Sequence, residues 1–402
     1  MFGSSGSGFT FNVNWAFYPS YSLTVSGAGI INNSGTTQTL VAAVDDFGDY
    51  GSISFTNSAS AGTLTAFTIS GAVADGVPGG SAEFFNNSTA ANSTFTNTRC
   101  LLPYGYGGFT AFYDTSTAGN ATLIAYASRG GDGAKIDIWG DATGGTSRVK
   151  VFGSPFGDYY SGNLDITLHN LPGVTIGSIE GSGTVHLGAK NLSVGSNNLS
   201  TTFSGSIDGI AGSFTKIGTG TLTLTGANTY TGVTTVEGGE LVVDNNTGSG
   251  TGTGPVQVNA GILTGRGFIT GAVTIGTGTG PNAALIPGKV DKNSGALTIQ
   301  RALTLESNAI YKFDLKTKTA RANKVVANAV LISDAQFILV NRGHAVIAPG
   351  TVFTVIDNTA ATAIAGPFSN LADGSTVTAG NNTFQADYEG GDGNDLTLTV
   401  MP

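Results

Sequence analysis

Cysteine and charge are the scarcest features of this 402-residue chain. Its one cysteine, Cys100, cannot form a disulfide within the chain, and we expect it to be buried as a small apolar side chain. Charged residues make up 11% of the sequence, against roughly 25% in ordinary globular proteins. The exposed surface must therefore be mostly uncharged but polar, with Thr, Ser and Asn supplying the polarity.

The sequence also has no basic run. Its formal net charge is −9, from 26 acidic and 17 basic residues, which argues against nucleic acid or an anionic membrane as a partner. The densest basic stretch, from Lys312 to Lys324, is expected to lie in a solvated loop or a short helix. No signal peptide and no 18-residue apolar span is visible, so we expect no membrane insertion by this segment.

Glycine, by contrast, is abundant, at 62 residues of 402, about twice the average usage. Collagen is excluded because no Gly-X-Y period runs through the chain. Disorder is disfavoured because Val, Ile, Leu, Phe and Thr alternate almost everywhere in a strand-like pattern. The composition favours an elongated repeat of short strands over several globular domains.

Residues 213–243 show the strand pattern most clearly. Leu222 and Leu224 alternate with threonines, so the two leucines face one side of a predicted strand. Further strands are predicted at 233–236 and 241–243, with glycines at the corners between them. Such a short segment cannot enclose a core alone, whereas stacked coils bury a continuous apolar column, so we predict a β-solenoid.

The same stretch resembles the autotransporter-associated β-strand repeat of bacterial surface passengers. The matching positions are Thr215, Lys216, Gly218, Gly220, Leu222, Leu224, Gly226, Asn228, Tyr230, Gly232, Gly239 and Leu241. The resemblance covers about thirty residues and implies an all-β fold, a right-handed parallel β-helix with a C-terminal capping region. The segment DYEGGDGNDLTLTV at the end of the chain is similar to the closing segment of such passengers.

A second repeat, near 28 residues long, runs from about Tyr21 to Asp208. In five aligned segments an apolar residue lies seven positions before a small one. The leading apolar residues are Phe55, Phe84, Phe112, Ile138 and Ile166. If each segment belongs to one coil, these side chains form a single buried ladder with a spacing of about 4.8 Å.

These patterns divide the chain into four parts. We expect a flexible lead at 1–19, N-terminal solenoid coils with the 28-residue repeat at 20–211, the passenger repeat with degenerate coils at 212–302, and terminal coils with the cap at 303–402. The cap is needed because the last coil of a solenoid otherwise exposes apolar core and an unpaired strand edge. Self-association through strand edges, near Leu23 to Ile31, is a further expectation.

An enzyme has to be considered because polysaccharide lyases and hydrolases share this fold class. The pair Asp45-Asp46 and the cations Arg148 and Lys150 are similar to elements of polygalacturonases, but the Gly-His-Gly element between them is absent. We interpret Asp45-Asp46 as turn-forming residues. The histidines, His169, His186 and His344, have no matching partner motif and are expected at ordinary surface or satisfied interior positions. We therefore predict no catalytic residue.

Metal binding has one candidate, residues 390–398, which resembles the calcium nonapeptide of repeat toxins through its glycines, Asp392 and Asp395. The motif fails at Thr397, where a large apolar residue is expected, and only one copy is present. A sharp acidic turn before the last strand is the better interpretation. Ice binding by Thr221, Thr223 and Thr225 is disfavoured. It would need a flat solenoid face on which neighbouring coils repeat the threonines in register, and here only one strand has them. No metal or cofactor is predicted.

The sequence thus favours a non-enzymatic, extracellular passenger at the surface of a bacterium, either a structural stalk or an adhesin. The expected partners are a host or neighbouring-cell surface, glycans or matrix. A carbohydrate-active β-helix enzyme is the alternative, and a self-assembling extracellular fibre component is a minor one. Convergence of Asp45, Asp46, Arg148 and Lys150 in one groove would support the enzyme.

Overall fold

The protein is an all-β solenoid of stacked parallel strands, as the sequence predicts. The computed structural model describes residues 10–13, 21–157, 160–288 and 295–402. Within these ranges no helix has the length and apolarity needed to cross a lipid bilayer. The chain divides into two compact units, Met1–Ser213 and Phe214–Pro402, and each is described separately below.

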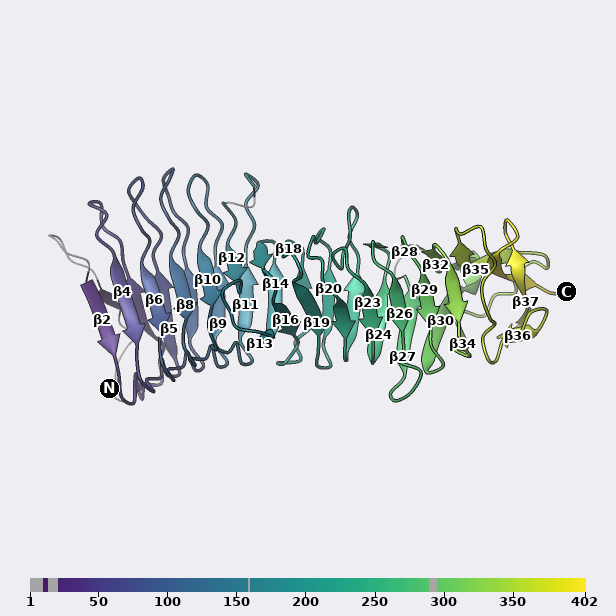
Figure 1. Ribbon diagram of the computed structural model, residues 1–402, viewed down its shortest axis with the longest axis horizontal. Helices are drawn as coiled ribbons and strands as arrows, with labels where there is room; N and C mark the ends of the chain where they lie inside the picture. The colour runs from purple at the N-terminus through teal and green to yellow at the C-terminus, as the bar shows by residue number, and fades with distance from the viewer. Residues whose placement is uncertain (1–9, 14–20, 158–159, 289–294) are drawn as a thin grey trace. The chain divides into compact units, whose positions relative to one another are not determined.

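Unit 1 has two long parallel sheets and a short third one. The first sheet contains, in spatial order, β1 (Thr10–Val13), β3 (Gln38–Ala42), β5 (Thr65–Ile69), β7 (Thr94–Asn97), β9 (Thr122–Ala125), β11 (Arg148–Val151), β14 (Ser178–Gly181) and β17 (Thr201–Phe203). The second contains β18 (Ser206–Asp208), β15 (Thr184–His186), β12 (Asn163–Asp165), β10 (Lys135–Ile138), β8 (Phe109–Phe112), β6 (Ser81–Phe84), β4 (Gly51–Phe55) and β2 (Tyr21–Val25). The third pairs β13 (Gly173–Ile176) with β16 (Asn191–Val194). Figure 1 shows these strands side by side as successive coils.

The coil length of unit 1 follows the predicted 28-residue repeat. Thr94 of β7 lies opposite Thr122 of β9, 28 positions later in the chain. A row of isolated parallel bridges, Ser60 to Thr89 to Thr117 to Thr143, continues the same repeat on the third side of the coils. Sequence repeats and structural coils therefore coincide up to β12. The prediction that the 28-residue repeat runs on to Asp208 is wrong, because the next two coils take 21 residues, from Asn163 to Thr184, and 22 residues, from Thr184 to Ser206.

The core of unit 1 contains the predicted aromatic ladder. The Phe55 and Phe84 rings stack with centroids 4.6 Å apart, the Phe84 and Phe112 rings at 4.7 Å, and none of the three is exposed. Ile138 continues the register opposite Phe112, and Ile166 is also fully buried. A second ladder, which we did not predict, places Phe67 and Phe95 at 4.4 Å on the other sheet. The inward phase of the repeat is confirmed.

Unit 2 continues with the same kind of parallel coils. One sheet contains β20 (Thr221–Leu224), β22 (Glu240–Val243), β24 (Gly261–Gly265), β27 (Ala283–Pro287), β30 (Ala309–Lys316) and β31 (Arg321–Ala322), and β34 (Gln336–Asn341) also pairs with β30. Another contains β19 (Ser213–Lys216), β21 (Thr234–Val236), β23 (Val256–Val258), β26 (Val273–Ile275), β29 (Leu303–Leu305) and β33 (Val330–Ile332). The last contains β25 (Phe268–Ile269), β28 (Ala296–Ile299), β32 (Lys324–Ala327), β35 (Val352–Asn358), β38 (Asp395–Val400), β37 (Asn382–Gly390) and β36 (Thr376–Ala379).

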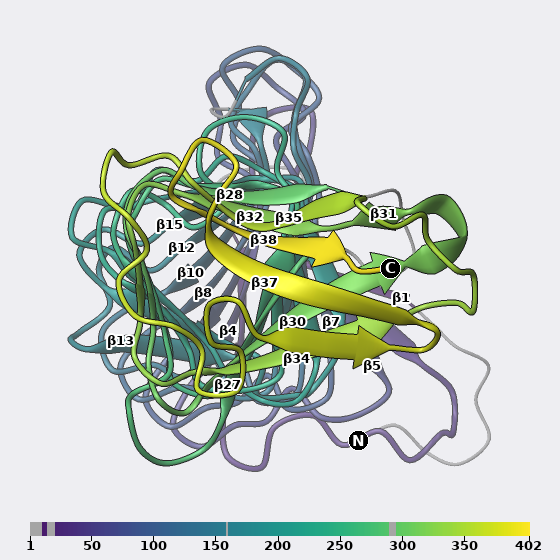
Figure 2. The ribbon, with the colours of Figure 1, turned by 90° about the vertical axis from the view of Figure 1, so that its right-hand side faces the viewer.

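The C-terminal end of unit 2 changes from parallel to antiparallel pairing. Strands β36, β37 and β38 pair antiparallel, and β38 also pairs antiparallel with β35 (Figure 2). Such a segment can close the end of a stack of parallel coils. Its strands pair with each other in antiparallel fashion, so they do not continue the parallel ladder to which a further coil would pair.

Two expectations need correction. Residues 10–13, which we placed in a flexible lead, form strand β1 and pair with β3, while the rest of the lead lies outside the described residues. The basic stretch does not form a loop: Lys312 and Lys316 lie on β30, and only the next residues form the 3₁₀ helix η2 (Thr317–Thr319). In β30 the apolar residues Tyr311, Phe313 and Leu315 occupy alternate positions, and all three are buried. This period of two is the pattern of a strand with one face in the core.

Candidate functional site

The residues that would support an enzyme do not converge. Asp45 lies in the loop after β3, where its Oδ1 accepts hydrogen bonds from the backbone N–H groups of Phe47 (2.9 Å) and Asp49 (3.0 Å), as a turn-forming aspartate does. Arg148 and Lys150 lie on β11, and three strands separate β11 from β3 within the sheet. The carboxylate pair and the cation pair therefore belong to different coils.

The two cations of β11 are also already paired. Arg148 Nε lies 2.7 Å and Lys150 Nζ 3.0 Å from Oε1 of Glu180 on the neighbouring strand β14. Burial opposes ionisation of Glu180, but the hydrogen bonds from both cations outweigh it and lower the pKa of this carboxyl. Both cations therefore pair with a carboxylate of the neighbouring coil. Because they are already paired, the enzyme alternative is not favoured.

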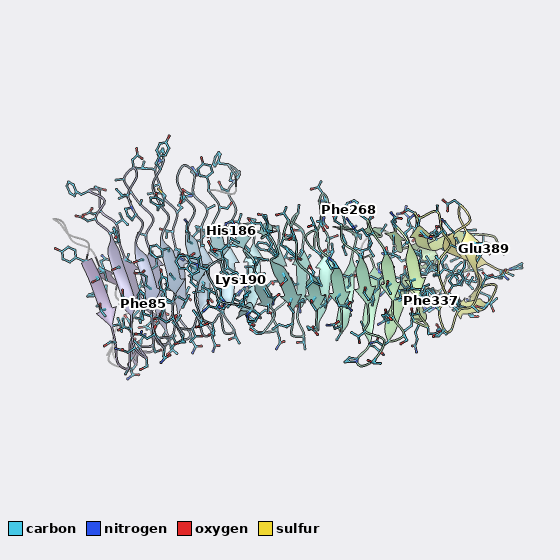
Figure 3. The ribbon with its side chains drawn as sticks, in the orientation of Figure 1. Phe85, His186, Lys190, Phe268, Phe337 and Glu389 are labelled. Atoms are coloured by element: carbon cyan, nitrogen blue, oxygen red, sulfur yellow. The ribbon has the colours of Figure 1, made fainter. Side chains whose placement is uncertain are left out.

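The histidines occupy ordinary positions. His169 is buried, and its Nδ1 and Nε2 lie 2.6 Å and 2.8 Å from the carbonyl oxygens of Asn170 and Ala142. His186 on β15, labelled in Figure 3, contacts Asp208 of β18 at 2.9 Å. This hydrogen bond raises the pKa of His186. His344 is exposed.

The calcium-like segment and Cys100 also have structural explanations. Residues 391–394 form the turn between β37 and β38, and Asp395 Oδ1 accepts a hydrogen bond from the backbone N–H of Asn358 (2.8 Å). Within the described ranges no group of three or more His, Cys, Asp or Glu side chains could hold a metal. Cys100 is fully buried, as expected, and burial raises the pKa of its thiol.

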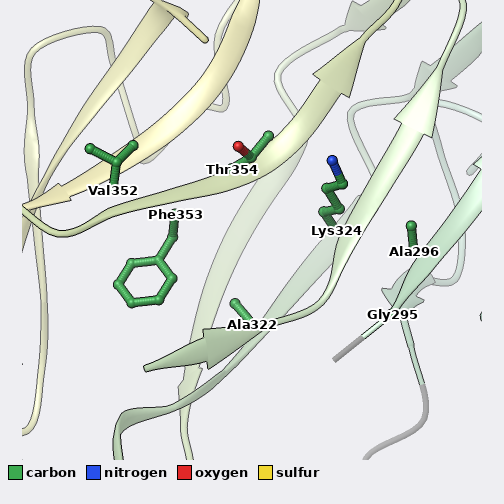
Figure 4. A pocket seen from close by; sticks show the side chains of 7 residues that line it. All are labelled: Gly295, Ala296, Ala322, Lys324, Val352, Phe353 and Thr354. Atoms are coloured by element: carbon green, nitrogen blue, oxygen red, sulfur yellow. The ribbon is translucent and has the colours of Figure 1, made fainter. Parts of the chain in front are cut away.

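Two surface hollows hold side chains that are already bonded. One, of about 420 Å³, is lined by His169 and by Asp141, whose Oδ1 accepts from Asn170 Nδ2 at 2.8 Å. The other, of about 360 Å³, lies between β28, β32 and β35 (Figure 4). Its Lys324 ammonium lies 2.6 Å from Asp357 Oδ2. The ionisable side chains that line these hollows are therefore bonded to protein groups.

A more distinctive feature is a row of long loops on one side of unit 1, which we call the crest. In Figure 1 these loops project together above the strands labelled β2 to β12. They join the first sheet to the second and comprise residues 43–50, 70–80, 98–108, 126–134 and 152–157 with 160–162. The sequence analysis missed the crest, because these segments carry no apolar period.

The crest loops are fixed to one another by backbone hydrogen bonds. Ala72 donates to the Tyr106 carbonyl (2.8 Å), Gly107 donates to the Asp132 carbonyl (3.1 Å), and Ser128 donates to the Tyr160 carbonyl (2.7 Å). Four consecutive loops are thus linked in series. These bonds continue the backbone hydrogen bonding between neighbouring coils into the loops. The crest is therefore an ordered surface.

Exposed apolar side chains are concentrated at the crest. Phe47 is 82% exposed, Tyr104 81% and Phe156 61%. Leu101, Leu102, Tyr106 and Tyr126 are also exposed. Scattered apolar residues are normal on a surface, whereas several on adjacent ordered loops mark an interaction surface. The crest is therefore the candidate binding surface of this chain.

A row of ionisable side chains crosses the outer face of the second sheet. Glu83, Asp137, Asp165, His186 and Asp208 occupy equivalent register positions, with Ala111 between the first two. Asp137 is only 7% exposed. Burial, and next the charge of Asp165, raise the pKa of Asp137 to about 7. This carboxyl therefore titrates near neutral pH.

The repeat at 213–243 forms a compact corner in unit 2. Lys216 is 1% exposed, and its ammonium donates to the carbonyl oxygens of Ile217 (2.7 Å), Gly238 (3.2 Å) and Gly218 (3.4 Å). Burial lowers the pKa of Lys216 to about 8. Tyr230 is fully buried and its hydroxyl lies 2.5 Å from Thr234 Oγ1. These motif positions thus hold the coil closed through contacts within the chain.

Comparison with known proteins agrees with this geometry. A family model described as the passenger-associated-transport-repeat matches residues 214–243, the compact corner of unit 2. The chain therefore carries, at these residues, a repeat of the kind described for passengers. A stretch of 109 residues, 25% of this chain, is 41% identical to the adhesin BmaC autotransporter of Brucella suis biovar 1 (strain 1330). The chain spans only 3% of the length of that relative.

Solved structures also match this chain. The crystal structure of the Haemophilus influenzae Hap adhesin matches 98% of this chain and 60% of its own, at 12% sequence identity and a TM-score of 0.26.

Proposed function

We propose that this chain is part of a non-enzymatic passenger at the bacterial cell surface or in the extracellular space, and that its crest is an adhesive surface carried on solenoid coils. The passenger repeat at 214–243 is the observation that carries the proposal. The 41% sequence identity to an adhesin autotransporter over 109 residues supports the same surface location.

The chemistry of the described residues supports binding in preference to catalysis. A polysaccharide lyase or hydrolase needs carboxylates or cations that meet around one reacting bond. Here Asp45 bonds within its own loop, and Arg148 and Lys150 both form ion pairs with Glu180. The crest instead offers exposed aromatic side chains on linked loops, and such side chains are enriched at binding surfaces.

The proposed partners are surfaces of host or neighbouring cells, through glycans or matrix. The net charge of −9 disfavours nucleic acid and anionic lipid. Aromatic and uncharged polar side chains together suit ligands that combine apolar faces with hydroxyl or amide groups.

An adhesion assay tests the proposal. Latex beads coated with the full chain should be retained on epithelial cells and on matrix-coated glass, and soluble chain should compete with them. Beads coated with albumin are the control. Retention no greater than that of albumin beads, together with release of reducing ends or unsaturated products from polysaccharides by the chain, would favour the enzyme alternative and contradict this function.

A further inference from the structure

The crest presents apolar side chains outward. Phe47, Tyr104 and Phe156 lie near the middle of their loops and are 82%, 81% and 61% exposed, and Leu101 is also 61% exposed. Both surface hollows described above are lined by residues outside the crest. The loops rise side by side in Figure 1, and in Figure 2, which looks along the coils, they overlap in one narrow projection. A partner of the crest must therefore accept side chains that protrude toward it.

The backbone N–H groups at these positions are already bonded within the protein. Five exposed apolar residues donate to a protein oxygen: Phe47 to Asp45 Oδ1 (2.9 Å), Phe156 to Ser154 Oγ (3.2 Å), and Leu101, Tyr104 and Tyr106 to the carbonyl oxygens of Ala72, Gly130 and Val77 (3.2 Å each). An unpaired backbone N–H is costly away from water, and most of all in lipid. The crest loops can therefore leave water without stranding these donors.

The types of side chain suit the interface of a lipid bilayer. Phe and Leu are apolar throughout, whereas Tyr joins an apolar ring to a hydroxyl that can stay in water, and tyrosine is enriched at membrane interfaces for this reason. A bilayer needs no preformed cavity for protruding groups. The apolar parts of peripheral proteins enter the boundary between headgroups and acyl chains to a depth of about 5–10 Å.

The charges of the crest favour a bilayer without net charge. Exposed Asp46 and Asp75 lie on the first two loops, and exposed Arg99 and Arg129 lie on the third and fourth. The two carboxylates and the net charge of −9 oppose contact with anionic lipid. A zwitterionic headgroup offers a phosphate to the guanidinium groups and an ammonium to the carboxylates. Because Asp46 directly precedes Phe47, the first loop can enter only as deep as the headgroup layer.

We propose that the crest docks on a zwitterionic lipid bilayer, with Phe47, Leu101, Tyr104 and Phe156 entering the interface. This proposal rests on the adhesive function proposed above and assigns a lipid partner to the same surface. The contact lies on the bilayer without spanning it, so it needs no apolar run of about 18 residues. The hydrogen bonds between the second to fifth loops order the crest before contact, which lowers the loss of conformational entropy on binding.

Flotation of the full chain with vesicles of pure phosphatidylcholine tests this directly. The chain should float with the vesicles, and the bound fraction should change little between about 50 and 500 mM salt. Phe47→Ala, Tyr104→Ala and Phe156→Ala should each weaken partitioning by about fivefold to tenfold, because one apolar side chain no longer leaves water. Ile210→Ala, at a residue of unit 1 that is 84% exposed and lies outside the crest, should change nothing. Replacing part of the lipid by phosphatidylserine should give no tighter binding.

The depth of the contact gives a second measurement. In Tyr104→Trp the introduced indole should shift its emission to shorter wavelength on the vesicles and be quenched by brominated acyl chains, because it enters the interface. Ile210→Trp is the matched control, since Tyr104 and Ile210 are 81% and 84% exposed, and it should show neither change. Circular dichroism confirms that each variant is folded.

Four results would overturn the proposal: no flotation at millimolar lipid, unchanged partitioning of the three alanine variants at the crest, tighter binding to vesicles with phosphatidylserine, or equal quenching of the two introduced indoles. Coated beads that adhere to matrix-coated glass while the chain ignores vesicles would leave the adhesive function standing and overturn only the lipid contact. Beads retained no better than albumin beads, with a chain that does not float, would overturn both.

Discussion

Unit 1 and unit 2 build coils from similar short parallel strands but differ in what lies between the strands. In the part of unit 1 that carries the crest, Thr94 lies opposite Thr122, so a coil takes 28 residues, and a large part of them forms the crest. In the repeat of unit 2 Thr221 lies opposite Glu240, so a coil takes only 19. The wide coils present side chains to solvent, whereas the narrow coil uses its corners to hold the coil closed.

The same contrast holds for the interior. Unit 1 fills its coils with stacked rings, such as Phe84 on Phe112, whereas the repeat in unit 2 encloses polar groups, with Lys216 held by three carbonyl oxygens. An aromatic ladder tolerates long loops because its stability comes from burial. A hydrogen-bonded corner needs fixed backbone positions, and glycines supply them.

The largest expected effect comes from breaking the ladder of unit 1. Phe112→Ala should lower the free energy of unfolding by about 3–5 kcal/mol, because the ring is fully buried and stacked on Phe84. Urea unfolding followed by the fluorescence of Trp139 in a Trp15→Phe background measures the loss. Ile210→Ala, at a residue 84% exposed, is the control. A loss below about 1 kcal/mol would contradict the inward phase of the repeat.

Much of this ladder could be read from the sequence, and the reason is geometric. A coil returns each residue to the same phase, so Phe55, Phe84 and Phe112 reveal their shared direction through spacing alone. The crest could not be read in this way. Exposure of Tyr104 depends on loops that are neighbours only after the coils stack, and the sequence of those loops has no apolar period.

The burial and the contacts of two charged residues also could not be predicted from the sequence. Lys216 was recognised as a motif residue, but only the fold shows that its ammonium lies among carbonyl oxygens. Asp137 gave no signal, because its burial follows from the neighbouring strands that place Ala111 and Asp165 beside it. A sequence pattern fixes which face a residue occupies, whereas the solvation of that face is set by other coils.

The corners of the two units can be compared with a matched pair of glycines. Gly239→Ala should destabilise unit 2 by about 3 kcal/mol, because its φ is +64° and an added Cβ would lie 2.5 Å from the Gly220 carbonyl oxygen and 2.8 Å from Lys216 Nζ. Gly76→Ala in the crest has a similar φ of +69° but open space around it, so about 1 kcal/mol is expected. Urea midpoints give both values. Equal losses would show that crest and corner are equally constrained.

The buried carboxyl of unit 1 predicts a pH dependence. Because the pKa of Asp137 is raised to about 7, folded protein holds a proton between about pH 4 and 7 that the unfolded chain releases, so stability falls as pH rises through this range. Asp137→Asn should remove that fall and be more stable than wild type at pH 8 by about 2–3 kcal/mol, with little difference at pH 4. Trp139 directly follows β10, and its fluorescence reports the transition. A constant difference between the two proteins from pH 4 to 8 would contradict burial of the charge.

Lys216 predicts the opposite slope in unit 2. Burial lowers its pKa to about 8, so between about pH 8 and 10 the unfolded chain binds a proton that the folded state has lost, and stability rises with pH. Relative to Lys216→Met, the wild-type protein should gain about 2 kcal/mol over this range, because the neutral amine loses its desolvation cost while it still donates to carbonyl oxygens. Hydrogen exchange of the β19 and β22 amides, corrected for intrinsic rates, measures the local stability. Lys190→Met in unit 1 controls for the loss of one lysine. If the wild-type and Lys216→Met amides show the same pH dependence, the ammonium is solvated and the corner is held by its glycines alone.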